Sequence, residues 1–289
     1  MTAVKRRTLA RPAPCSGRGL FTGTPCTITF LPAQAGIFFV RTDASGHVPA
    51  HHHHLDAAPI HPAFAHVKPR STNLALGNAR VATVEHALSA LAGLGVTDCA
   101  IEIDGPETPI LDGSARPFAQ AIQAAGLAEL PGTCEPITLD APITVEDGPA
   151  SIRAEPRQEP GISIVYQLDY GPDAPLPPQC ATWDGSPQAY LRSIAPARTF
   201  CTQAEATALQ AAGLFKDLSP KDMLVIAKDG PIDNAYRMPG EPAAHKLLDA
   251  IGDFVLAGRP IQANITCTRS GHALNHDLAR ALAHAPHAS

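Results

Sequence analysis

The chain has 289 residues, enough for two domains that each bury a core. Hydrophobic residues make up 45% of it and charged residues 17%, which excludes a disordered acidic chain. The formal net charge is -5, so the chain lacks the surplus of basic residues that is typical of nucleic-acid-binding proteins. Seven widely spaced cysteines form no C-x-x-C pair, and the sequence has neither an apolar signal segment nor an 18-residue apolar run. We therefore expect a cytoplasmic protein without disulfides or membrane spans.

The first half of the chain predicts strands, then a helix, a strand and a second helix. Apolar side chains of the first helix recur at i, i+3, i+4 and i+7, and Thr83 is expected to cap its N-terminus. The predicted ranges are strands at 26–31, 36–41 and 98–103, and helices at 83–95 and 117–127.

The second half repeats this rhythm after a stretch at 127–136 that has the composition of a domain linker. We expect two α+β domains of similar size, over 1–128 and 135–289, without a repeat at the level of sequence. The predicted elements are strands at 136–145, 150–154, 161–169, 222–227 and 261–268, a strand and helix within 199–213, and helices at 187–193, 241–257 and 272–283.

Four consecutive histidines, His51 to His54, could suggest a metal site. Four adjacent side chains cannot all face one ion in a regular element, and a metal site needs fixed geometry around its ligands. The run therefore predicts a solvated loop with fortuitous metal affinity.

The helix predicted over 241–257 carries His245, Asp249 and Asp253 at i, i+4 and i+8, on a different face from its apolar stripe. Histidine and aspartate at this spacing can both bind one Zn²⁺. A charged surface ridge with an incidental histidine would give the same pattern, so the helix alone leaves both interpretations open.

Two further motifs supply the groups that a metal hydrolase needs. His86, early in a predicted helix, is the best candidate for a third ligand, and the neighbouring Glu85 could accept a proton from water. A glutamate at an ordinary helix start is the alternative. His272 opens the last helix and could act as a general acid if a carboxylate such as Asp253 raises its pKa. Together the motifs suggest a metal hydrolase with two histidine ligands and one aspartate.

Five sequence blocks, in this order and spacing, resemble the zinc-dependent UDP-3-O-acyl-N-acetylglucosamine deacetylases of lipid A biosynthesis. The blocks are TVEHALSALAGLGVTD, ETPILDGSARPF, ARTF, HKLLDAIGD and SGHALN. The resemblance covers about residues 6 to 283, and the last two blocks are highly specific. It implies hydrolysis of the N-acetyl group of UDP-3-O-[(3R)-3-hydroxyacyl]-N-acetylglucosamine to a free amine and acetate, the committed step of that pathway.

The resemblance implies one Zn²⁺ per chain, with Fe²⁺ as the alternative metal, bound by His86, His245 and Asp249. Glu85 would be the base that activates water, and His272 the protonated group that stabilises the oxyanion or protonates the leaving amine.

The remaining roles are also implied by the resemblance. Asp253 would orient the general acid, Thr199 would help to hold the oxyanion, and Lys246 and Phe200 would contact the substrate. The implied fold packs the helices of two α+β domains between two β-sheets, with an insert in each domain forming the active site and the second insert forming an acyl passage. The expected partner is a small-molecule substrate of a monomeric enzyme, with transient contact with a membrane surface and none with nucleic acid.

The chain departs from the family pattern at several positions. Phe21 stands where the family usually has histidine, and Asp217 and Leu218 stand where it commonly has two glycines. Bulk at the latter position would alter the preferred acyl length. Two alternatives remain: a related metal-dependent amidohydrolase with another acylated or sugar substrate, and a non-catalytic binding protein with the same fold.

Overall fold

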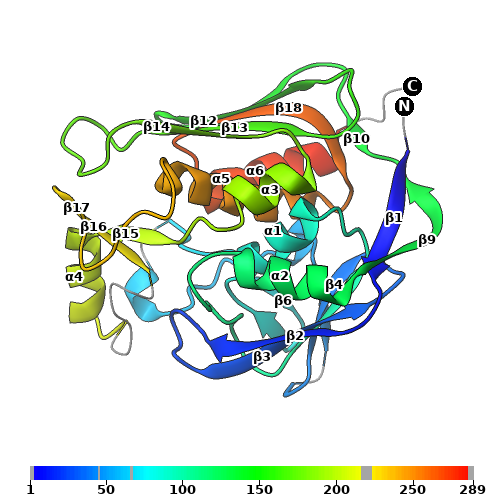
Figure 1. The fold of residues 1–289 in the computed structure, drawn as a ribbon, viewed down its shortest axis with the longest axis horizontal. Helices are drawn as coiled ribbons and strands as arrows, with labels where there is room; N and C mark the ends of the chain where they lie inside the picture. Colours follow the sequence, from blue (N-terminus) through cyan, green and yellow to red (C-terminus); the bar gives the residue numbers. More distant parts are fainter. Residues whose placement is uncertain (1–2, 45, 66–67, 216–222, 286–289) are drawn as a thin grey trace.

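The computed structural model describes residues 3–44, 46–65, 68–215 and 223–285. Two β-sheets form its outer layers, and helices from both halves of the chain lie between them (Figure 1). This is the α+β sandwich that the family resemblance implied. No helix in the described ranges is long and apolar enough to cross a membrane.

The first sheet has the strand order β2-β3-β8-β4-β5. The pairs β2–β3, β3–β8 and β4–β5 are antiparallel, and β4–β8 is parallel. Side chains alternate between core and solvent along β3, where Ile28 and Phe30 are fully buried, as expected for a sheet covered on one face. The strands are β2 (Ala13–Arg18), β3 (Pro25–Pro32), β4 (Ile37–Arg41), β5 (His47–Pro49) and β8 (Cys99–Ile103).

The second sheet repeats this arrangement, with the order β11-β12-β18-β13-β14. Again the first two pairs and the last are antiparallel, and the third, β13–β18, is parallel. The two halves therefore share a topology that their sequences do not reveal. The strands are β11 (Ile143–Asp147), β12 (Ala150–Pro156), β13 (Ser163–Leu168), β14 (Gln179–Trp183) and β18 (Ile261–Thr268), with β10 (Ile137–Thr138) alongside β18.

The helical layer is held by an unusually close approach between α1 and α5. A Cβ atom built on Gly252 of α5 would lie 2.1 Å from the carbonyl oxygen of Glu85, so only glycine fits there. This approach places the start of α1 directly against the last turn of α5. The helices of the layer are α1 (Glu85–Gly93), α2 (Arg116–Ala125), α3 (Pro187–Ser193), α5 (Glu241–Phe254) and α6 (His272–Ala283).

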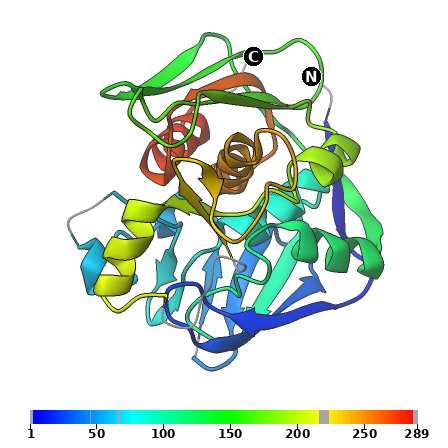
Figure 2. The ribbon, with the colours of Figure 1, turned by 60° about the vertical axis from the view of Figure 1, so that its left-hand side comes forward.

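Smaller elements flank the two sheets (Figure 2). A three-stranded unit with α4 lies at one end of the helical layer, and short 3-10 helices interrupt the loops. These elements are η1 (His52–His54), η2 (Pro62–Phe64), β6 (Leu74–Leu76), β7 (Ala79–Val81), β15 (Phe200–Thr202), α4 (Gln203–Ala211), β16 (Leu224–Ala227), β17 (Gly230–Pro231) and η3 (Val255–Ala257).

Three expectations from the sequence are wrong in detail. The stretch expected as a linker forms β9 (Leu127–Cys134), which pairs antiparallel with β1 (Val4–Leu9). Thr83 does not cap α1, because its hydroxyl donates to Glu107 Oε1 at 3.0 Å and the N-cap residue is Val84. The histidine run is not uniformly solvated, because His52 is buried.

Candidate metal centre and active site

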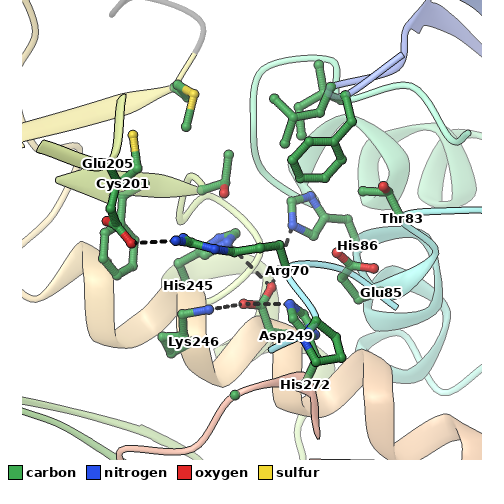
Figure 3. A pocket seen from close by; sticks show the side chains of 18 of the residues that line it. Arg70, Thr83, Glu85, His86, Cys201, Glu205, His245, Lys246, Asp249 and His272 are labelled. Carbon is green, nitrogen blue, oxygen red and sulfur yellow. Dashed lines mark hydrogen bonds and ion pairs between the residues drawn. The ribbon is translucent and has the colours of Figure 1, made fainter. Parts of the chain in front are cut away.

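A cavity of about 130 Å³ lies where the N-termini of α1 and α6 meet the first half of α5 (Figure 3). Its lining brings together residues from widely separated stretches of sequence. Eight of the nine site residues predicted from the sequence line it: Glu85, His86, Thr199, Phe200, His245, Lys246, Asp249 and His272. The ninth, Asp253, lies directly behind His272.

Two histidines and an aspartate converge at the centre of this site. Asp249 Oδ1 is 3.6 Å from His86 Nε2 and 3.4 Å from His245 Nε2, and all three side chains are buried. Asp249 Oδ1 has no hydrogen-bond partner among the described residues, which is costly for a buried carboxylate oxygen. Donors that share one tetrahedral ion at 2.0–2.2 Å lie about 3.4 Å apart, so these three residues fit a metal ion.

Two side chains of the triad, His245 and Asp249, are oriented by neighbouring groups. The Nδ1–H of His245 donates to the Ala197 carbonyl at 3.1 Å, which leaves Nε2 facing Asp249 with a free lone pair. Burial lowers the pKa of His245 to about 3, so the ring is neutral. Lys246 Nζ donates to Asp249 Oδ2 at 2.8 Å. Against the effect of burial, the positive charge of Lys246 holds the pKa of Asp249 well below its ordinary value.

Glu85 lies beside the triad with its carboxylate buried. The backbone N–H of Thr72 donates to Glu85 Oε2 at 2.9 Å. Burial raises the pKa of this carboxyl to about 7, against the opposing effect of His272 and His86. This places a proton acceptor beside His86, at the edge of the group formed by His86, His245 and Asp249 (Figure 3).

His272 and Asp253 form a buried pair on the other side of the cavity. His272 Nδ1 donates to Asp253 Oδ2 at 2.9 Å, and Nε2 lies 4.0 Å from Asp249 Oδ2. Burial lowers the pKa of His272, but Asp253 outweighs it and raises the pKa to about 9. The imidazole is therefore protonated at neutral pH and can donate from Nε2 into the cavity.

Three residues that the sequence analysis missed hold Asp253 in place. Asn275 Nδ2 donates to Oδ2 at 2.8 Å, and the Thr72 hydroxyl donates to Oδ1 at 2.5 Å. Because the hydrogen of that hydroxyl points to Asp253, its oxygen accepts a hydrogen bond from His276 Nε2 at 2.8 Å. His276 follows His272 at i+4, a spacing that could have indicated it. Thr72 is a single threonine in a loop and offers no such signal.

The stretch from Ala197 to Phe200 is tied to the start of α5 by a buried ion pair. Arg198 Nε donates to Glu241 Oε1 at 2.7 Å and its terminal nitrogen to Oε2 at 3.1 Å. This bidentate contact fixes the segment that holds His245 and presents Thr199 and Phe200 to the cavity. The Phe200 ring lies 6.2 Å from that of His245.

One side of the cavity is apolar. We call this surface the apolar cluster; it includes Phe21, whose ring centroid is 5.2 Å from that of Phe64 and 5.9 Å from that of Phe215. A salt bridge of 2.8 Å between Arg70 and Glu205 spans the cavity beside it. Asp217 and Leu218 lie outside the described residues. The apolar cluster comprises Leu20, Phe21, Ile60, Phe64, Ile110, Cys201, Ala206, Leu209, Leu214, Phe215, Met223 and Val225.

Comparison with known proteins identifies the family of this chain. A family model described as UDP-3-O-acyl N-acetylglycosamine deacetylase matches residues 6–284. The chain belongs to this family. The deacetylase of Anaeromyxobacter dehalogenans (strain 2CP-C) is 38% identical over 283 residues, covering 97% of this chain and 88% of that protein. The Anaeromyxobacter sp. (strain Fw109-5) protein is 40% identical, covering 97% and 89%, and the Acidithiobacillus ferrooxidans (strain ATCC 53993 / BNL-5-31) protein is 36% identical, covering 96% and 90%. All three are named UDP-3-O-acyl-N-acetylglucosamine deacetylases.

The family resemblance stated from the five sequence blocks is thus confirmed over nearly the whole chain. As a member of this family, the chain is a hydrolytic enzyme. Its candidate metal centre is formed by His86, His245 and Asp249.

Proposed function

We propose that this enzyme hydrolyses the N-acetyl group of UDP-3-O-[(3R)-3-hydroxyacyl]-N-acetylglucosamine, in lipid A biosynthesis. The observation that carries the proposal is the convergence of three metal-ligand side chains with a carboxylate and a protonated imidazole in one cavity. Amide hydrolysis needs an activated water, a charge sink for the oxyanion and a proton for the leaving amine.

The metal in this proposal is zinc, with ferrous iron as the alternative, held by His86, His245 and Asp249. The support is the donor set, two imidazoles and a carboxylate with an unpartnered buried oxygen. When bound, zinc would supply Lewis-acid polarisation of the scissile carbonyl and lower the pKa of water.

Glu85 and His272 move the protons in the proposed reaction. The Glu85 carboxylate, fixed by Thr72, takes a proton from the water whose oxygen forms the new bond to the acetyl carbon. His272, held by Asp253, stabilises the oxyanion from Nε2 and gives its proton to the sugar nitrogen as the C–N bond breaks. The products are acetate, which carries the oxygen of the water, and the free amine, which carries the proton from His272.

Thr199 and Lys246 are proposed to contact the substrate around the reacting centre. Thr199, presented by the Arg198–Glu241 pair, would help to hold the oxyanion, and Lys246 would contact the nucleotide-sugar portion. Phe200 and the apolar cluster would receive the acyl chain. The cluster supports this role because it borders the metal centre and supplies an apolar surface that a fatty acyl chain can cover.

The remaining expectations are proposed on the same basis: a monomer with domains at 1–128 and 135–289, located in the cytoplasm. The seven free cysteines support a reducing compartment.

The proposal is tested by the variant Glu85→Gln, with Glu135→Gln as control because Glu135 is exposed and outside the cavity. Acetate release by Glu85→Gln should fall by about 10²–10⁴-fold, while metal content stays at that of the parent. Glu135→Gln should match the parent. Equal turnover in both variants would refute the role of Glu85.

A further inference from the structure

A second group of metal-ligand side chains lies outside the active site, at the 3-10 helix η1. His51, His52 and His53 place one ring nitrogen each within 4.8 Å of the others. Their ring centroids are 4.2 Å apart for His51 and His52, and 4.0 Å for His52 and His53. The tight turn of the 3-10 helix brings together side chains that a strand would send to opposite sides.

His52 is the residue that the rest of the structure does not explain. Its side chain is only 7% exposed, and neither ring nitrogen has the geometry of a full hydrogen bond, although the backbone of Leu256 interacts with the ring. This one weak backbone partner does not replace both of the contacts with water that burial removes from an imidazole. A bound ion would supply the missing partner.

A fourth imidazole, from the far end of the chain, lies beside this group, although only His51, His52 and His53 have ring nitrogens within 4.8 Å of one another. His284, which follows α6, has its ring centroid 5.3 Å from that of His52. Its Nδ1–H donates to the Arg280 carbonyl at 2.7 Å, which leaves Nε2 with a free lone pair. A histidine that donates one nitrogen to a backbone carbonyl while the other binds metal is a common arrangement around protein-bound ions.

We propose that His51, His52, His53 and His284 form a second metal site, for a divalent transition-metal ion such as Zn²⁺. Imidazole nitrogens suit zinc, copper and nickel, whereas Mg²⁺ and Ca²⁺ prefer oxygen ligands. The ion would link a loop of the first half to the helix that begins at His272.

The site is tested by titrating tag-free, zinc-loaded enzyme with Zn²⁺ in a calorimeter. The parent should bind one further equivalent. His53→Ala and His284→Ala, both at exposed positions that folding tolerates, should each weaken that second binding at least about tenfold. The matched control is His54→Ala, from the same run, because among the described residues the His54 ring makes no ring contact with the four proposed ligands; it should bind as the parent does.

Three results would overturn the proposal: no second equivalent in the parent, unchanged binding after either His53→Ala or His284→Ala, or an equal loss in His54→Ala. The last would show collective affinity of the run without a built site. Failure of the active-site assignment is distinguishable, because it would appear in His245→Ala as an unchanged first equivalent.

Discussion

Replacing Gly252 with alanine tests how the packing of two helices sets the active-site geometry. The added Cβ would lie 2.1 Å from the Glu85 carbonyl oxygen and 2.8 Å from its carbonyl carbon. Both are backbone atoms at the first residue of α1, so no side-chain rotation relieves the clash. Real Cβ atoms essentially never lie closer than 3.0 Å to such atoms. To reach that distance, α1 has to move away from α5 by about 1 Å.

This displacement separates Glu85 and His86 from His245 and Asp249. A misplacement of about 1 Å costs on the order of 10²-fold in rate, so kcat/KM should fall about 100-fold. Overpacking costs about 1–3 kcal/mol, partly offset by about 1 kcal/mol from the higher helix propensity of alanine. We expect Tm to fall by roughly 2 °C.

Gly93→Ala is the matched control, because its Cβ would meet the buried Tyr190 ring at 2.4 Å, at the other end of α1. Acetate release should be measured for both variants about 20 °C below their Tm values, where folded protein dominates. Gly93→Ala should lose stability with kcat/KM within about threefold of the parent. A Gly252→Ala enzyme with parental kcat/KM would refute the proposed link between helix packing and catalysis.

The remaining predictions concern three other buried contacts. Asp98 accepts from Arg6 at 2.5 and 3.2 Å, and although burial acts to raise its pKa, Arg6 holds it below the ordinary value. This contact stabilises the fold above about pH 4, and the stabilisation is lost as the pH falls further. Asp98→Asn should therefore lower the free energy of unfolding in urea by about 2 kcal/mol at pH 7 and by much less at pH 3. A decrease that does not depend on pH would contradict this. Arg198→Lys should cost about 3 kcal/mol in the same assay, because the buried Glu241 loses its bidentate partner; a loss below about 1 kcal/mol would show that lysine replaces the contact. Thr72→Val keeps the backbone N–H that donates to Glu85 but removes the hydroxyl that donates to Asp253, the partner of His272. We expect kcat to fall about tenfold with KM unchanged. An unaltered kcat would exclude this positioning role.

The placement of the proposed metal ligands on one helix could be predicted from the sequence because that information is local. His245 and Asp249 are one turn apart, so helical periodicity alone places them on one ridge. The capping of α1 could not be predicted in the same way. Thr83 has the right residue type for a cap, but its hydroxyl is taken by Glu107, 24 residues away in sequence. A tertiary contact here overrides a local preference.

Contacts of long sequence separation also explain what was missed at the site. Thr72 contacts Asp253 across 181 residues, and nothing around either residue encodes that pairing. The burial of His52 likewise depends on the packing of η1 against α6, which brings His284 to it. The family resemblance supplied the roles of Thr199 and Phe200, which no periodicity indicates.

The central claim is that this cavity hydrolyses an N-acetyl amide with the help of a metal held by His86, His245 and Asp249. The most direct test is acetate release from UDP-3-O-(3-hydroxyacyl)-N-acetylglucosamine, before and after chelation and after return of one equivalent of zinc. The account predicts turnover that chelation abolishes and zinc restores, for the parent but not for Asp249→Ala. Turnover that survives complete metal removal, or none with metal bound across several acyl lengths, would contradict it.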